Sequence, residues 1–426
     1  MRFAGRLLRR CDGDRLSANG SGDYNATVMN TFVHLLRADW LTASRARLYG
    51  LGLGIATTAF LGWVLTLTAW HAAARPVALD FAAFWAAAHL AASGHAGGAY
   101  NNALIEATEQ AATSMAPGYL AFYYPPTALM LALPLGLLGY STALAMFLVA
   151  EMAVVWAALR RILPQRWAWL PLLTYPGFLM NGLSGQNAAL SAACFAGGAV
   201  WLDRRPLLAG ACLGGLACKP QLAVCIPVAL VAARRWRALA ACAATAAGLA
   251  AFAWLVLGTA AWRGFAANIP MARTDIETIP MKWPMMQSLF GAVRLAGGGN
   301  TLAYAAQGTV SLAALCLLVW ICARRPGAKL EGAALTTAAL LFTPFLYDYD
   351  LAVACVPMAC LTALAQPRGW LAGEKIVLML LFVVPLAARA AGMGFRITLG
   401  PPLLMALVLV LARRGWLTAR ETTATA

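Results

Sequence analysis

Continuous apolar runs, separated by short polar breaks, extend along the chain from Leu48 to about residue 412. They are rich in Leu, Ala and Val and lack the alternation of barrel strands, so the pattern predicts membrane helices. We expect an all-α polytopic membrane protein with about 11–13 helical segments. Several runs are only about 12 to 16 residues long, which is too short to cross a bilayer unless they are tilted or broken. Broken helices of this kind are typical of proteins that hold a cavity at membrane depth.

The composition agrees with this pattern, because 62% of the residues are hydrophobic and only 11% are charged. An ordinary soluble domain has about 25% charged residues, so a large soluble domain is excluded. Nine of the ten cysteines lie in or beside apolar runs, where a free cysteine behaves as a small hydrophobic residue. Because the sequence has no CxxC or Cys/His metal spacing, we expect neither a bound metal nor a cofactor.

The net charge of +16 would suit a nucleic-acid-binding protein, but the distribution of the charge argues against that partner. Of the 32 basic residues, 24 lie in residues 1–47 or in clusters between apolar runs, such as Arg234 to Arg237 and Arg413 to Arg420. Such clusters stay cytoplasmic under the positive-inside rule. We therefore expect a multi-pass protein of the cytoplasmic membrane with both termini in the cytoplasm.

The chain divides into a cytoplasmic arm (1–47, of which 1–28 is expected to be disordered), a membrane domain (48–412) and a cytoplasmic tail (413–426). Outer loops are expected at 71–122 and 258–300.

The outer loops carry local patterns of their own. In the first loop, residues 81–92 and 103–115 are expected to form short helices at the membrane interface. In the second, Arg263 to Met286 resembles a lid or a substrate-facing loop more than a span. One inconsistency remains, since Arg160 and Arg161 belong inside although two apolar runs separate them from the first outer loop. Either 124–138 is re-entrant or this pair breaks the rule.

Asp80 follows directly after the first apolar run, in the sequence LDFAAFW. Phe81, Phe84 and Trp85 limit its hydration, so its pKa is expected to rise towards values that are useful for a general base. Asp80 is therefore the expected catalytic residue. The alternative is an interfacial aspartate that caps the following helix.

Two further segments place polar groups at the outer boundary. In YLAFYYPPTALM the prolines start a helix, and Tyr124 at its rim either contacts the substrate or belongs to an aromatic belt. In NGLSGQNAAL the amides of Gln186 and Asn187 are suited to bind sugar hydroxyls, although a capped turn would use the same residues.

Lys219, in ACKPQLAV, lies between two short apolar runs with no acid nearby in the sequence. A lysine at such depth is costly and indicates a function, here as the partner of a phosphate or of an acidic residue. The alternative is a side chain that snorkels to the outer interface.

Further residues of the outer segments are expected to contact the substrate: Arg273, Lys282, Tyr347, Asp348, Asp350 and Arg396. The two aspartates of FTPFLYDYDLAV lack the additional oxygen ligands that a metal prefers. We expect them to pair with Lys219 or Arg396 instead.

Taken in order, LDFxxFW, YPP, GQN, KPQ followed by RRWR, KWPMMQSLFG and TPFLYDYDL resemble glycosyltransferase family 87, which is related to polyprenol-phosphate-mannose-dependent mannosyltransferases. The resemblance covers about residues 30 to 412. It implies the C-type glycosyltransferase (GT-C) membrane fold, a lipid-linked sugar donor and a catalytic aspartate in the first outer loop, which corresponds to Asp80.

On this resemblance we expect a glycosyltransferase that moves a hexose, with mannose implied, from a polyprenyl-phosphate donor to a lipid or glycan acceptor. The reaction is expected on the outer face of the membrane, as an inverting displacement with Asp80 as the base. Lys219, Lys282, Arg273 and Arg396 are the candidate cations for the donor phosphate.

Three other functions fit parts of the pattern. A transporter or flippase of a lipid-linked or small polar substrate would also place polar residues among broken helices, but it usually shows internal repeats. An O-antigen ligase or polymerase shares the lipid-linked donor but usually carries its long outer loop late in the chain. A structural membrane subunit would not need Lys219 or the outer carboxylates.

Overall fold

The computed structural model describes residues 37–70, 79–113, 120–165 and 174–425. The predicted disordered arm, 1–28, and the beginning of the first outer loop, 71–78, lie outside these residues. The first part of the described chain forms α3 (Ala43–Trp70), α4 (Leu79–Ala92), η1 (Ala96–Tyr100), α5 (Asn102–Thr113), α6 (Pro126–Ala132), η2 (Leu133–Leu137), α7 (Tyr140–Ile162), α9 (Pro176–Ser184), α10 (Ala188–Trp201), α11 (Pro206–Gly214) and η3 (Gly215–Cys218). The second part forms α12 (Pro220–Ala223), α13 (Cys225–Ala232), α14 (Trp236–Thr278), η4 (Pro280–Met285), α15 (Leu289–Leu295), α16 (Asn300–Cys322), α17 (Ala328–Phe342), η5 (Asp348–Ala354), α18 (Cys355–Arg368), α19 (Glu374–Phe395) and α20 (Gly400–Thr425).

Six helical stretches of the described chain are long and apolar enough to cross a membrane. They are Tyr140–Ile162, Trp236–Thr278, Asn300–Cys322, Asp348–Arg368, Glu374–Phe395 and Gly400–Arg420. Shorter apolar stretches accompany them at Pro126–Leu137, Ala188–Trp201, Pro206–Cys218 and Pro220–Ala232. The prediction of an all-α polytopic membrane protein with both long and short apolar helices is therefore confirmed.

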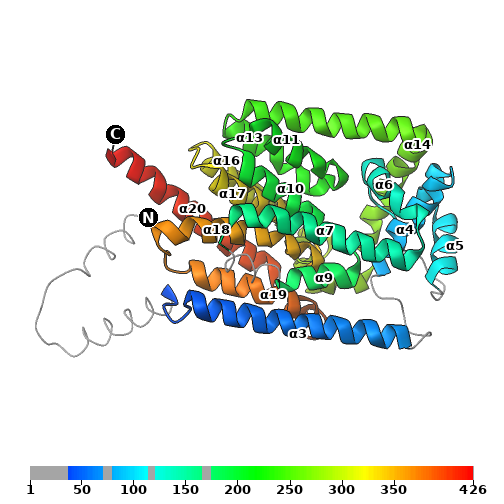
Figure 1. The fold of residues 1–426 in the computed structure, drawn as a ribbon, viewed down its shortest axis with the longest axis horizontal. Coiled ribbons are helices and arrows are strands. Elements are labelled where there is room, and N and C mark those ends of the chain that lie inside the picture. Colours follow the sequence, from blue (N-terminus) through cyan, green and yellow to red (C-terminus); the bar gives the residue numbers. More distant parts are fainter. Residues whose placement is uncertain (1–36, 71–78, 114–119, 166–173, 426) are drawn as a thin grey trace, which may run out of the picture.

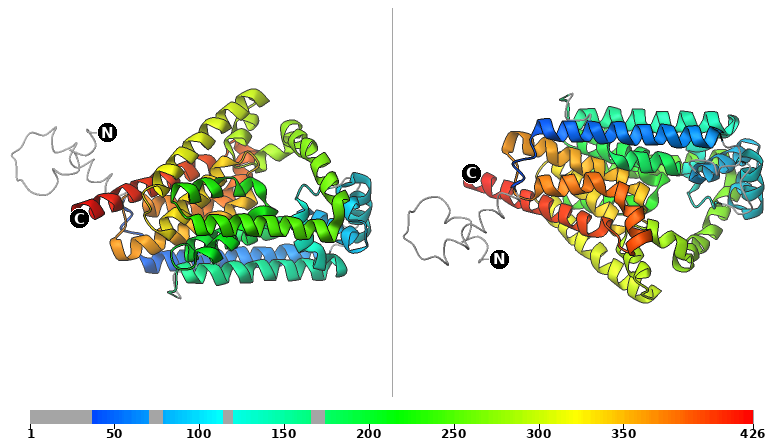
Figure 2. Two further views of the ribbon diagram at one scale, coloured as in Figure 1. Left: turned by 90° about the horizontal axis from the view of Figure 1, so that it is seen from above. Right: turned by 90° about the horizontal axis from the view of Figure 1, so that it is seen from below.

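Two ends of the molecule can be distinguished by the elements that lie there (Figures 1 and 2). The beginning of α3 and the end of α20 lie at one of them, which we call the basic end. There the guanidinium groups of Arg161 and Arg205 both lie over the ring of Trp201, at 5.4 and 5.1 Å from its centroid. Helices α4 and α5 lie at the opposite end, which we call the loop end.

The segment formed by α6 and η2 packs against α4 at the loop end. The indole nitrogen of Trp85 donates to the carbonyl oxygen of Leu138 at 2.9 Å, and His89 Nδ1 lies 3.0 Å from the carbonyl oxygen of Gly136. Helix α7 follows, and its last turn carries Arg160 and Arg161. This packing favours the re-entrant alternative, under which the arginine pair would follow the positive-inside rule, and the sidedness of the chain stays a prediction.

Helix α4 is buried on all its sides, whereas the sequence predicted a helix at the interface. Every residue from Phe81 to Ala88 is buried. The ring of Phe81 packs against Phe147 at 5.3 Å between centroids, and that of Phe84 against Tyr124 at 4.6 Å. The predicted short helices are confirmed, but the predicted interfacial position is wrong for α4, because a helix that is apolar all round belongs in a core.

Helix α14 is interrupted at Gly258, where φ is 74° and ψ is 174°. Glycine adopts this conformation far more readily than any other residue. Beyond the break the chain turns onto the loop end (Figure 1), where Asn268 donates to the carbonyl oxygen of Tyr100 at 3.3 Å. The stretch from Arg263 to Met286 is therefore helical and not a loop, because α14 continues to Thr278 and η4 follows, while its role as a lid or a substrate-facing segment stays a prediction. The i,i+4 pair of Arg273 and Glu277 supports this helical stretch.

Small residues allow the short helices to approach one another closely. A Cβ atom on Gly210 in α11 would lie 2.2 Å from the carbonyl oxygen of Ala238 in α14, so the two backbones are almost in contact. One large core joins α9, α10, α13, α17, α18 and α20, and a second joins α4, α7 and α14. Polar residues from the elements of both cores meet at the candidate site.

Candidate active site

Asp80 is the second residue of α4, so its carboxylate stands where this buried helix begins. The side-chain amide of Gln186 donates to Asp80 Oδ2 at 2.8 Å. Burial raises the pKa of Asp80, while the hydrogen bond from Gln186 and the positive charge of Arg389 oppose that shift, and the net change is upward. The predicted rise in the pKa is thus confirmed. A position in the first turn also suits a carboxylate, so the geometry fits both a helix-start residue and a base, and the role as base stays a prediction.

The turn between α9 and α10 brings two amides towards Asp80. Gly185 ends α9 in the left-handed conformation, with φ 71°, and Asn181 Oδ1 accepts from the backbone nitrogen of Ala188 at 2.8 Å. The capped turn is therefore present and is made by other residues of the segment, while sugar binding by Gln186 and Asn187 stays a prediction. Gln186 and Asn187 remain available to make side-chain contacts across the site.

Tyr124 joins these two amides. Its hydroxyl donates to Gln186 Oε1 at 2.7 Å and lies 3.5 Å from Asn187 Oδ1. Burial raises the pKa of Tyr124, and the charge of Asp80 raises it further, so the phenol stays protonated and remains a donor. Tyr124 is thus part of the site and not a residue of an aromatic belt.

Lys219 lies in a buried ion pair with Asp350. Its Nζ is 2.5 Å from Asp350 Oδ1 and 3.1 Å from Asn187 Oδ1, and the side chains of the ion pair are each 3% exposed. The acid that is missing near Lys219 in the sequence is thus supplied by η5, as the predicted pairing required. Snorkelling is excluded by this burial. A direct contact between Lys219 and a phosphate stays a prediction. The ammonium group of Lys219 already uses two of its three donors, one to Asp350 and one to Asn187.

Arg389 is the residue that sequence reasoning did not assign to the site. Its Nε and Nη2 donate to Asp348 Oδ2 and Oδ1 at 2.7 and 3.2 Å, and its side chain is 37% exposed. The predicted pairing of these aspartates with Arg396 is wrong, since Arg396 Nε donates to the carbonyl oxygen of Leu295 at 2.9 Å. The available signal was the arginine itself, isolated in the apolar run VVPLAARAAG.

Tyr347 stands among the carboxylates of the site. Its backbone nitrogen donates to Asp350 Oδ2 at 3.2 Å, and its ring stacks on Tyr349 with 5.4 Å between centroids. Burial raises the pKa of Tyr347, and the charges of Asp80 and Asp350 raise it further. The phenol is therefore protonated and can donate to a bound group.

Lys282 lies at the border of the site, where its Nζ is 2.7 Å from Asp275 Oδ2. The hydroxyl of Tyr123 donates to the same oxygen at 2.8 Å. The positive charge of Lys282 also acts on Asp80. Arg273 is not brought into this group, because its Nε donates to Glu277 Oε1 at 2.7 Å and its side chain is 67% exposed.

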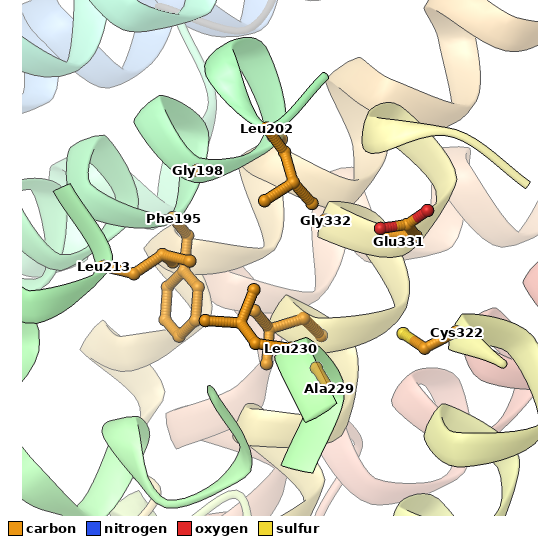
Figure 3. A pocket seen from close by; sticks show the side chains of 11 residues that line it. Phe195, Gly198, Leu202, Leu213, Ala229, Leu230, Cys322, Glu331 and Gly332 are labelled. Carbon is orange, nitrogen blue, oxygen red and sulfur yellow. The ribbon is translucent and has the colours of Figure 1, made fainter. Parts of the chain in front are cut away.

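The small cavity in Figure 3 shares no residue with these contacts. Its volume is about 10 Å³, and Phe195, Leu213 and Leu230 line it beside Glu331. Arg235 holds the carboxylate of Glu331 at 2.9 Å. Such a cavity holds about one water molecule, so it is not a substrate site.

The arrangement at Asp80 combines one carboxylate of raised pKa with two partly exposed cations, Arg389 and Lys282. The side-chain amides of Gln186 and Asn187 and the phenols of Tyr124 and Tyr347 belong to the same group of residues and are hydrogen-bond donors. Such a site can remove a proton from a hydroxyl group and hold an anionic group beside it.

Comparison with known proteins gives one result. The family model described as glycosyltransferase family 87 matches residues 122–347. No curated protein and no solved structure matches the chain.

Proposed function

The chain belongs to glycosyltransferase family 87, and on that basis we propose that it transfers mannose from a polyprenyl-phosphate donor to a lipid or glycan acceptor. It is a membrane glycosyltransferase with several apolar helices. The proposed site is the group of residues around Asp80 at the loop end, which faces outward across the cytoplasmic membrane. We further propose that the membrane domain has the GT-C architecture.

The observation that carries the proposal is the state of Asp80. An inverting displacement needs one base, because the acceptor hydroxyl is the nucleophile and no covalent intermediate forms. The acceptor oxygen attacks C1 of the donor sugar, the bond from C1 to the phosphate oxygen breaks, and the hydroxyl proton passes to Asp80. Burial raises the pKa of Asp80, which makes its carboxylate a better acceptor for that proton.

The phosphate that leaves with the lipid needs a positive partner. Arg389 and Lys282 are the candidate cations for this phosphate, because their side chains are 37% and 28% exposed and can reach a bound group. Both charges act on Asp80, so a phosphate bound to them lies close to the base. Arg273 and Arg396 are held elsewhere, by Glu277 and by the backbone of Leu295.

Lys219 then acts mainly through Asn187. Its Nζ holds Asn187 Oδ1, and Asn187 in turn lies against the hydroxyl of Tyr124 that binds Gln186. Lys219 therefore fixes the amides that would bind sugar hydroxyls and orient the base. In this role it is a positioning residue for the reaction.

The experiment compares two donors with purified protein and an envelope-lipid fraction as the acceptor. Radiolabelled polyprenyl-phosphate mannose is expected to give labelled product and free polyprenyl phosphate, while the nucleotide sugar alone gives none. Transfer from the nucleotide sugar without a lipid carrier would refute the lipid-linked donor.

The role of Asp80 is tested with Asp80→Asn, which keeps the shape and removes the basicity. The transfer rate is expected to fall about 10²- to 10⁴-fold with donor binding retained, because the carboxylate acts as the proton moves. Asp203→Asn, which changes a carboxylate paired with Arg235, is the matched control and is expected to keep the normal rate. A normal rate in folded Asp80→Asn would exclude Asp80 as the base.

A further inference from the structure

A large groove lies between α3 and the pair α18 and α19, at the basic end. Its volume is about 620 Å³, within the range of pockets that bind small molecules. Its lining includes Trp40, Trp370 and Lys375, at or before the beginnings of α3 and α19, and Leu53 and Val383 farther along these helices. The wall from Lys375 to Val383 is nine residues of one helix, so the groove extends about 12 Å along α19.

The groove exists because α3 contacts the body over only part of its length. Thr174 Oγ1 donates to the carbonyl oxygen of Gly50 at 2.9 Å, and Gly50, Gly54 and Thr57 are the buried residues among those of the helix whose burial is described. Between these contacts and its first residue, α3 lines the groove opposite α19. Tyr49 and Val383 on the two walls are 54% and 45% exposed, so the groove is open to the side.

The chemistry of the lining changes along the groove. Arg47 on α3 and Lys375 on α19 contribute cations near the beginnings of these helices, and no Asp or Glu is among the groove's described lining residues. Lys375 Nζ donates to the carbonyl oxygen of Ala38 at 3.2 Å. Two acids are next to lining residues in the described sequence: Glu374 is held by Arg414 at 2.6 Å, and Asp39, before Trp40, is exposed. Farther along α3 and α19 the lining is apolar, with Leu53, Leu378 and Phe382 among its residues.

We propose that this groove binds one glycerophospholipid with an anionic headgroup, taken from the leaflet at the basic end. Arg47 and Lys375 bind the headgroup phosphate, and an acyl chain lies along α19 between Leu378 and Val383. The aromatic residues Trp40, Tyr49 and Trp370 mark the level of the headgroups, as such residues do at membrane interfaces. Basic pockets between membrane helices are a known kind of site for anionic headgroups.

Charge decides between this lipid and the other possible occupant, the segment 1–36 of the same chain. That segment carries five arginines and three aspartates, so it is basic and suits a cationic groove poorly. An anionic lipid complements the groove at both its polar and its apolar part. The proposal is independent of the proposed transfer reaction, because the groove shares no residue with the group around Asp80.

The test measures lipid binding to the purified full chain by native mass spectrometry. Phosphatidylglycerol and phosphatidylcholine with the same acyl chains are titrated separately. About fivefold in affinity is expected from each cation, so phosphatidylglycerol is expected to bind about 25-fold more tightly. Lys375→Gln combined with Arg47→Gln is expected to abolish the preference, whereas Arg324→Gln combined with Arg325→Gln, two basic residues outside the groove, keeps it.

A second variant keeps the test independent of the folding of the first. Ala46→Trp places a large ring in the groove and is expected to weaken binding of both lipids at least tenfold. A photoreactive benzoylphenylalanine at Ala46 is expected to label added phosphatidylglycerol. The proposal is overturned by equal affinity for the two lipids, by a preference that survives loss of both cations, by unchanged binding in Ala46→Trp, or by cross-linking to residues 1–36.

Discussion

The hydrogen bond from Gln186 to Asp80 controls how readily the carboxylate takes a proton. Donation to the charged form lowers the pKa of Asp80, against the upward shift caused by burial. Gln186→Leu removes the donor, so the pKa of Asp80 is expected to rise further. The base is active when it is deprotonated, and the acidic limb of a plot of kcat against pH therefore moves to higher pH. Thr127→Val is the control. It removes a buried hydroxyl that donates to the carbonyl oxygen of Ala217 and not to Asp80, so it is expected to leave the acidic limb in place.

An acidic limb that does not move in Gln186→Leu would contradict this role. It would mean that the group titrating in kcat is not Asp80, and that Asp80 is not the base.

The ion pair of Lys219 and Asp350 is expected to be important for folding because both side chains are buried. Lys219→Met leaves Asp350 as a buried charge without its cation, which costs about 3–5 kcal/mol. Lys219→Met combined with Asp350→Leu removes both charges and is expected to recover much of this loss. The partly exposed pair of Lys282 and Asp275 is the matched control, and Lys282→Met is expected to cost no more than about 1 kcal/mol. Thermal unfolding in detergent measures the stability of each variant. An equal loss of stability in Lys219→Met and Lys282→Met would show that burial does not determine the contribution of the ion pair.

At the scale of the helix, the break in α14 depends on Gly258. Its backbone, with φ 74° and ψ 174°, is a conformation that costs other residues about 1–3 kcal/mol, although a Cβ atom there would meet nothing within 4 Å. Gly258→Ala is therefore expected to lower the unfolding temperature through backbone strain alone. Gly248→Ala in the same helix is a matched control with equal space and no positive φ, and it is expected to be neutral or stabilising. The same effect in both variants would show that the break does not need glycine.

The elements could be predicted from the sequence where a local signal defined them. The prolines of YPP start α6, and the Gly-rich turn after Ala92 separates α4 from α5. Burial of α4 could not be predicted, because it depends on Phe147 and Tyr124, which approach from other segments. The helical end of α14 was missed for a similar reason, since Pro270 and the charges nearby indicate a loop unless the pairing of Arg273 with Glu277 is known.

At the scale of the whole molecule, the candidate site is an assembly of distant segments. Asp80, Gln186, Lys219 and Asp350 come from α4, a turn, a helix start and η5, and hydrogen bonds through Tyr124 and Asn187 connect them. The sequence identified these polar residues because each is out of place among apolar neighbours. It could not say which acid meets which cation, so Lys219 and Arg396 were both candidates, whereas Lys219 pairs with Asp350 and Arg389 pairs with Asp348. Partner choice is a property of the packed helices and is not encoded in local spacing.

The arrangement of the two ends predicts how the chain lies in the membrane. Gly94 follows α4 at the loop end, whereas Pro164 follows the arginine pair of α7 and Arg414 lies in the last helix, whose end is at the basic end. Basic clusters stay in the cytoplasm, so fusions after Pro164 and after Arg414 are expected to be cytoplasmic and a fusion after Gly94 to be outside. A phosphatase that is active only outside and a fluorescent protein that folds only inside report the two locations. If the fusion after Pro164 behaved like the one after Gly94, the segment from Pro126 to Leu137 would have to cross the membrane, and the re-entrant arrangement that brings Asp80 to an outward-facing site would be wrong.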